Sequence, residues 1–74
     1  MNSSKVRKSI SELLREEGNS IYKSLNEKLT GLTRELKLKN ASNLYERAIY
    51  EAMNEDELSS AYKNISYTQF DLFK

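Results

Sequence analysis

The 74-residue sequence has no cysteine, histidine, proline or tryptophan, and only two glycines. Without cysteine the chain can form neither a disulfide nor a thiolate metal site, and without histidine it lacks the commonest metal ligand and general base. The two glycines stand apart, so they cannot form a phosphate-binding loop, and no reactive motif surrounds any serine, threonine, lysine or tyrosine. The sequence therefore predicts a protein that is not an enzyme, has no small-molecule substrate and needs no metal or other cofactor.

Long hydrophobic runs are also missing. No apolar stretch is long enough to cross a membrane, and the first residues do not lead into a signal-peptide core. We therefore expect a cytoplasmic protein without membrane contact. Because only 38% of 74 residues are hydrophobic, the core of this single domain would be thin, and we expect a homodimer or a complex with a partner to stabilise it.

Charge is distributed unevenly along the chain, although the formal net charge is only +1. Residues 1–39 hold nine Lys or Arg and five Glu, a balance of +4, whereas residues 40–74 hold three basic and six acidic residues, a balance of −3. Such asymmetry is typical of chains with two surfaces for different partners. The alternative is that these side chains simply coat solvent-exposed faces.

Apolar residues recur every three or four positions through most of the chain, which is the spacing of amphipathic helices. The sequence therefore predicts an all-α or mainly α fold, a small bundle of three to four short helices within residues 1–74. An N-terminal helix within residues 1–18 would be capped by Ser3 or Ser4 and end at Gly18. Asn54 would cap a later helix, whose first turn is acidic and whose inner face carries Leu58, Ala61, Tyr62 and Ile65. Residues 66–74 would form a short C-terminal tail.

Residues 20–38 allow two interpretations. A continuous helix is favoured by an apolar stripe over four turns, which consists of Ile21, Leu25, Leu29, Leu32 and Leu36. A short strand at 20–25 followed by a helix from Asn26 is the alternative, because Ile21 and Tyr22 favour strands. Lys23 would then share a face with Ile21, which speaks for the helix.

The segment 32–53 predicts a helix-turn-helix corner. One helix would close with Leu36 and Leu38, residues 39–42 would form the turn, and Ser42 or Asn40 would cap a helix that runs to Met53. Within it, residues 36–49 (LKLKNASNLYERAI) resemble the helix-turn-helix half of ribbon-helix-helix repressors, a resemblance that covers residues 20–53, and they also resemble an ordinary helix-turn-helix. The first resemblance implies a ribbon-helix-helix dimer with the strand at 20–25.

Both resemblances imply binding to duplex DNA through the start of the helix that follows the turn. A helix start offers unpaired backbone N–H groups and a positive dipole end to phosphates, and the lysines add positive charge. The DNA-binding residues expected on this basis are Lys37, Lys39, Asn40, Ser42, Asn43 and Arg47.

Aromatic residues are concentrated near the C-terminus, in the acidic half of the chain. Either Phe70 and Phe73 fold back to close a small core, or the aromatic side chains bind a partner protein. The partner-binding residues expected in the second case are Tyr62, Tyr67, Phe70 and Phe73. The two halves together predict a small DNA-binding transcriptional repressor or antitoxin-like protein of phage or plasmid type. The alternative is a helical protein–protein interaction module, such as a phage inhibitor, a secretion chaperone or an immunity-type protein, without nucleic-acid binding.

Overall fold

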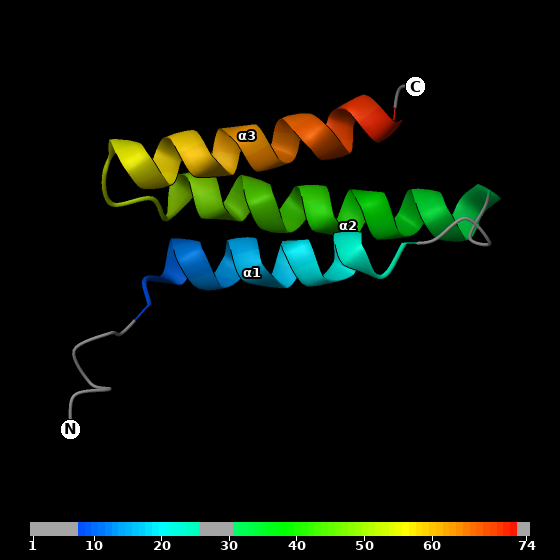
Figure 1. The fold of residues 1–74 in the computed structure, drawn as a ribbon, viewed down its shortest axis with the longest axis horizontal. Helices are drawn as coiled ribbons and strands as arrows, with labels where there is room; N and C mark the ends of the chain where they lie inside the picture. The colour runs from blue at the N-terminus through cyan, green and yellow to red at the C-terminus, as the bar shows by residue number, and fades with distance from the viewer. Residues whose placement is uncertain (1–7, 26–30, 73–74) are drawn as a thin grey trace.

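The computed structural model describes residues 8–25 and 31–72, which form three helices: α1 (Ile10–Lys23), α2 (Gly31–Tyr50) and α3 (Glu55–Leu72) (Figure 1). None of the described residues lies in a strand. The prediction of a small, all-helical bundle is therefore confirmed at this level, with three helices in the described part of the chain.

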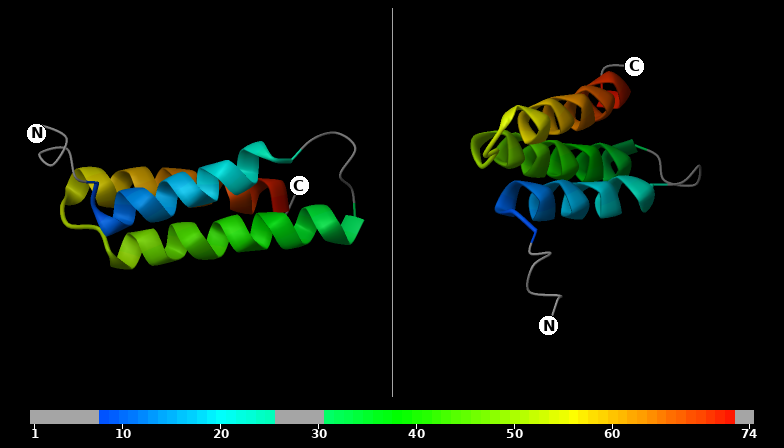
Figure 2. Two further views of the ribbon diagram at one scale, coloured as in Figure 1. Left: turned by 90° about the horizontal axis from the view of Figure 1, so that it is seen from below. Right: turned by 60° about the vertical axis from the view of Figure 1, so that its left-hand side comes forward.

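Helix α2 is the centre of the bundle, and α1 and α3 both pack along it. It runs antiparallel to the other two, which point in the same direction (Figure 1). When the molecule is turned by 90°, α1 and α3 lie on one side of α2 (Figure 2, left). One long side of α2 is therefore inside the bundle and the opposite side faces outwards.

Small residues form much of the core, and they recur at seven-residue spacing on every helix. The pairs are Ser11 and Gly18 on α1, Ala41 and Ala48 on α2, and Ala61 and Thr68 on α3, all of them buried. Seven residues are close to two helical turns, so each pair lies on one face. Small side chains on these faces let the helices approach closely, and the buried Ser11 Oγ donates a hydrogen bond to the Ala48 carbonyl at 2.8 Å.

Tyr45 is the largest fully buried side chain and explains the position of Gly18. Its ring lies directly over Gly18, where an added Cβ would stand 2.6 Å from Tyr45 Cε1. The Tyr45 hydroxyl donates to Asn19 Oδ1 at 2.6 Å. The prediction that Gly18 ends the first helix is therefore wrong, because this glycine makes room for a ring in the middle of α1. The helix begins at Ser9 as N-cap, whereas Ser3 and Ser4 lie outside the described residues.

The caps of α1 and α3 share one carboxylate. Ser9 Oγ accepts from the Glu12 amide at 3.0 Å and donates to Glu57 Oε2 at 2.6 Å. Glu57 Oε1 in turn accepts from the Met53 amide, and the Glu57 amide donates to Asn54 Oδ1, both at 2.9 Å. Asn54 thus caps α3 as predicted, and the exchange with Glu57 is a variant of the capping box. The helix starts of α1 and α3 are tied together through it.

One predicted strand, one predicted continuous helix and one predicted turn do not form. The alternative strand at 20–25 is wrong, because α1 continues to Lys23 and Ser24 closes it. The favoured continuous helix over 20–38 is wrong as well, because α1 ends at Lys23 and α2 begins at Gly31. The turn at 39–42 is wrong, because α2 runs without a break through these residues. Asn40 and Ser42 are tolerated inside the helix because the positions beside them bury a full face against α1 and α3.

The connection between α2 and α3 lies at residues 51–54, several residues after the predicted corner. The helix-turn-helix corner is therefore not at the place where the sequence puts it. The predicted C-terminal tail is mostly helical, because α3 extends to Leu72 and buries Thr68. Of the inner positions expected on α3, Ala61 is buried and Leu58 and Ile65 are half-buried, whereas Tyr62 is 54% exposed.

Candidate protein-interaction surface

A groove of about 410 Å³ lies between α2 and α3. We call it the α2/α3 groove. Half-buried Ile49 and Ile65 lie in it, and Tyr50 and Tyr62 line it with exposed fractions of 82% and 54%. Glu46, Ser66 and Gln69 complete its lining. An apolar floor with aromatic and polar walls is the usual composition of the centre of a protein-binding surface.

Among the described residues that line this groove, Glu46 is the one that carries a charge. The lining comes from the end of α2, but on α3 it comes from residues 62–69, the middle and second half of the helix. The carboxylates in the first turn of α3 lie outside the lining, and the helix dipole explains their position. The negative charge of Glu46 favours a basic residue in a bound partner.

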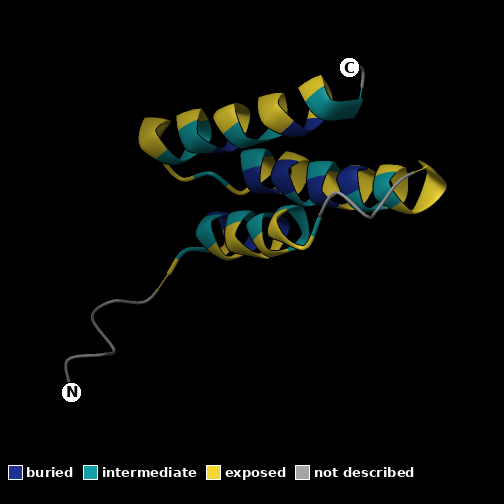
Figure 3. Cartoon of the chain, turned by 45° about the vertical axis from the view of Figure 1, so that its right-hand side comes forward, coloured by how far each residue is buried: buried dark blue, intermediate teal, exposed yellow. Residues whose placement is uncertain are grey.

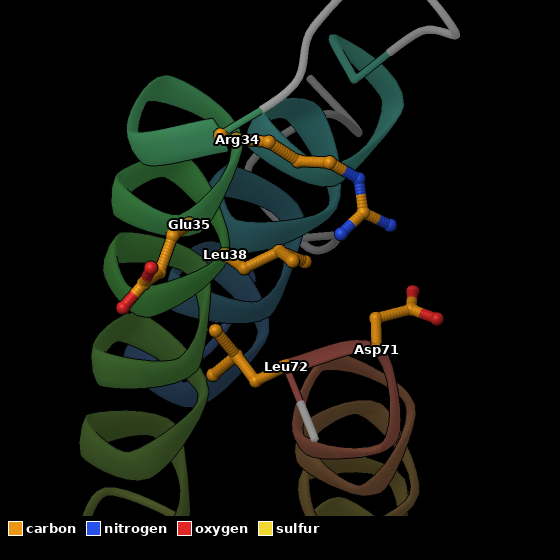
Figure 4. A pocket seen from close by; sticks show the side chains of 6 residues that line it. Arg34, Glu35, Leu38, Asp71 and Leu72 are labelled. Carbon is orange, nitrogen blue, oxygen red and sulfur yellow. The ribbon is translucent and has the colours of Figure 1, made fainter. Parts of the chain in front are cut away.

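A smaller pocket of about 230 Å³ lies at the opposite end of the bundle, between the start of α2 and the end of α3 (Figure 4). Arg34 and Asp71 reach towards the same space from the two helices, and Leu38 and Leu72 lie between the helices beside them (Figure 4). The Tyr22 hydroxyl of α1 donates a hydrogen bond to Asp71. This bond, together with burial, raises the pKa of Tyr22 to about 12, while the positive charge of Arg34 acts in the opposite direction. Polar groups from all three helices thus join this end of the bundle.

The six predicted DNA-binding residues all lie on α2, but not on one face. Lys37 is half-buried and its Nζ donates to Ser24 Oγ at 3.2 Å, and Ser42 is half-buried as well. The other four are exposed and lie on the side of α2 that faces away from the core: Lys39, Asn40, Asn43 and Arg47. Lys39 forms an ion pair with Glu35 at 3.2 Å. The structure therefore brings four of the six together on an exposed surface and directs two towards the neighbouring helices.

The predicted partner-binding aromatics separate in a similar way. Tyr62 lines the α2/α3 groove, whereas Tyr67 and Phe70 are exposed by 58% and 67% elsewhere on α3. Five residues of helix separate Tyr62 from Tyr67, a rotation of about 140°, so these two side chains leave α3 in different directions. Phe73 lies outside the described residues. The predicted set is therefore not one cluster.

Of the seven described residues that line the groove, only Tyr62 was among the predicted sites. Ile65 was expected on the inner face of its helix, but Tyr50 was not singled out. The signal that could have shown it is a second apolar stripe on α2, because Leu32, Leu36 and Tyr50 recur at helical spacing and are all exposed. Figure 3 shows how each helix alternates between buried and exposed positions, with the exposed sides turned outwards.

No helix among the described residues is long and apolar enough to cross a membrane. In the same part of the chain, no group of three or more Asp or Glu side chains is arranged to hold a metal ion. Comparisons with protein-family models, with curated proteins and with solved structures give no match. The function must therefore be inferred from the surface itself.

Proposed function

We propose that this chain is a non-enzymatic helical protein-interaction module, and that the α2/α3 groove binds apolar side chains of a partner protein. The observation that carries this proposal is the combination of Tyr50 and Tyr62, both more than half exposed, over half-buried Ile49 and Ile65. Exposed aromatic side chains beside an apolar floor supply large contact area at a low cost in side-chain entropy. Glu46 in the lining favours a partner in which a basic residue lies beside the apolar ones.

A pair of tyrosine variants on α3 tests this proposal. Full-length Tyr62→Ser and Tyr67→Ser should fold equally well, because both side chains are more than half exposed. Proteins retained from an extract of the source cells by the parent chain should be retained by Tyr67→Ser and lost with Tyr62→Ser. Identical retention by both variants would contradict the role of the groove.

The charge of the partner can be tested separately. Glu46→Lys reverses one charge in the lining of the groove, and Glu17→Lys makes the same change at an exposed position of α1. With a basic partner, the first variant should slow association markedly at low ionic strength, and the second should have a smaller effect. Equal rates for both variants would exclude a specific contact to Glu46.

A DNA-binding regulator is the second candidate, and one observation favours it: Lys39, Asn40, Asn43 and Arg47 are exposed together on α2. Against it, Glu35 pairs with Lys39 and Glu46 lies next to Arg47, so the surface is mixed in charge. If the parent shifts random duplex DNA at low salt, Lys39→Ala and Arg47→Ala should each lower the slope of log affinity against log salt by about one. A parent chain that shifts no DNA would remove this candidate.

A further inference from the structure

Helix α2 carries a second stripe with heptad spacing on its outer side. We define the outer stripe as Leu32, Leu36, Lys39, Asn43, Glu46 and Tyr50 of α2, together with Met53 of the connection that follows it; the steps alternate strictly between four and three residues. Every member is exposed, and four of them are large apolar side chains with exposed fractions between 51% and 82%. This is the pattern by which one helix pairs lengthwise with another.

Nothing within the described bundle covers this stripe. The inner side of α2, with Leu38, Ala41, Tyr45 and Ala48, follows the same alternating steps and is buried by α1 and α3. Both of those helices pack on the inner side (Figure 2, left), and the outer stripe comes near α3 only at Glu46 and Tyr50, which border the α2/α3 groove. The outer stripe therefore has the spacing of a helix–helix seam and lacks the second helix.

We propose that a second copy of this chain supplies that helix, with the two α2 helices antiparallel around a twofold axis close to Asn43. The order of residue types along the stripe is apolar, polar, apolar, so it reads almost the same in both directions. An antiparallel arrangement places Leu36 of one copy against Tyr50 of the other, and Leu32 near the connection that carries Met53. A twofold contact is self-complementary and closes at the dimer, so it leaves no copy of the stripe uncovered.

The charges of the stripe select the antiparallel orientation. Its single cation, Lys39, precedes Asn43, and its single anion, Glu46, follows it by a similar distance. In the antiparallel pair each Lys39 lies near Glu46 of the other copy, whereas a parallel pair would bring lysine to lysine and glutamate to glutamate. A polar residue such as Asn43 in the middle of an apolar seam is also a known means of fixing register.

Glu46 and Tyr50 belong both to the outer stripe and to the α2/α3 groove, so the dimer would compete with the proposed partner for them. Leu32 and Leu36 lie outside the groove and test the dimer separately. Leu36 and Leu13 provide a matched pair of variants, since their exposed fractions are 51% and 52% and Leu13 lies on α1, away from the stripe. We expect the full chain to sediment with twice its mass of 8.6 kDa. Leu36→Glu should weaken the dimer by about tenfold or more, and Leu13→Glu should leave it nearly unchanged.

Circular dichroism of both variants distinguishes lost association from lost folding. A parent chain that remains monomeric up to its solubility limit would overturn the proposal, whatever the outcome of the partner experiments. A dimer weakened equally by both variants would place the contact elsewhere and would overturn it too.

Orientation is tested by cross-linking, which is simple in a chain without native cysteine. Leu32→Cys and Met53→Cys are prepared separately, mixed, and treated with a short thiol-specific cross-linker. The antiparallel pair should give mostly mixed 32–53 products, because Leu32 and Tyr50 are about 27 Å apart along the helix and 32–32 contacts are then out of reach. Predominant 32–32 and 53–53 products would show a parallel pair and overturn the orientation.

Discussion

Tyr45 and Tyr50 lie five residues apart on the same helix, yet the first is 2% exposed and the second 82%. Tyr45 belongs to the inner side of α2, where its ring packs on Gly18 and its hydroxyl is bonded to Asn19. Tyr50 belongs to the outer stripe and borders the α2/α3 groove. Both sides of α2 have the same heptad spacing, so spacing alone does not determine which is buried. The small residues on α1 and α3 determine which side is buried, because they let these helices approach the inner side of α2 closely.

The largest difference between the two sides should appear when each tyrosine is truncated. Tyr45→Ala removes a fully buried ring and should cost about 3–5 kcal/mol of unfolding free energy. Because small domains have only about 5–15 kcal/mol in total, this variant should be close to unfolded. Tyr50→Ala should change the unfolding free energy by less than about 0.5 kcal/mol. Urea denaturation of both, at a low concentration where association does not contribute, provides the comparison, and similar losses would show that the two sides are not distinct.

The close approach of α1 to the inner side can be tested at Gly18. An alanine favours an isolated helix by about 1 kcal/mol over glycine, but here its Cβ would stand 2.6 Å from the Tyr45 ring. We therefore expect Gly18→Ala to be destabilising by about 1–3 kcal/mol. In a Tyr45→Leu background the same change should cost less, because the edge of the ring is gone, and the difference measures the coupling. A stabilising Gly18→Ala in the parent chain would contradict the packing.

Gly18 and the segment 39–42 show how far the sequence could predict the structure. The apolar periodicity correctly predicts helices, and the cap at Asn54 and the inner positions Leu58, Ala61 and Ile65 depend only on local chemistry. The role of Gly18 was predicted wrongly, because the residues next to a glycine do not show whether it ends a helix or makes room for a ring from another helix. The turn at 39–42 was misplaced for a related reason, since Asn40 and Ser42 favour caps when no tertiary contact opposes them.

The interaction surface was predictable only in part. Tyr62 was expected to bind a partner. It lines the groove, and its binding to a partner remains a prediction. The sequence could not show that Ile49 and Tyr50 stand beside it, because that depends on the angle at which α3 packs against α2. The outer stripe could be read from the sequence, but its exposure could not.

The Glu57 carboxylate, which connects the helix starts at Ser9 and Asn54, should make the stability of the fold sensitive to acid. Hydrogen bonds from Ser9 and from the Met53 amide lower the pKa of Glu57 below its ordinary value of 4.5. A group with a lowered pKa stabilises the fold above its unfolded pKa and loses this contribution as pH falls through the folded pKa. We therefore expect the midpoint temperature of thermal unfolding to decrease when the pH is lowered below about 4.5. In Glu57→Gln, the plot of this midpoint against pH should be flatter in the same range. Glu17→Gln, an exposed control on α1, should keep the parent's acid limb, and equal limbs for parent and Glu57→Gln would contradict this role.

The smallest effect is expected at the other end of the bundle, where Tyr22 of α1 bonds to Asp71 of α3. Tyr22→Phe removes one partly exposed hydrogen bond and should cost less than about 1 kcal/mol. The pKa of Tyr22 is nevertheless raised to about 12, first by this hydrogen bond and then by burial. A raised pKa means that the contribution is complete below pH 10 and is lost as pH rises towards 12. Because burial also raises the pKa of Tyr45, the tyrosinate absorbance of Tyr22→Phe should be subtracted from that of the parent chain. The difference should titrate near pH 12, and a midpoint near 10 would show that α1 and α3 are not joined through this pair.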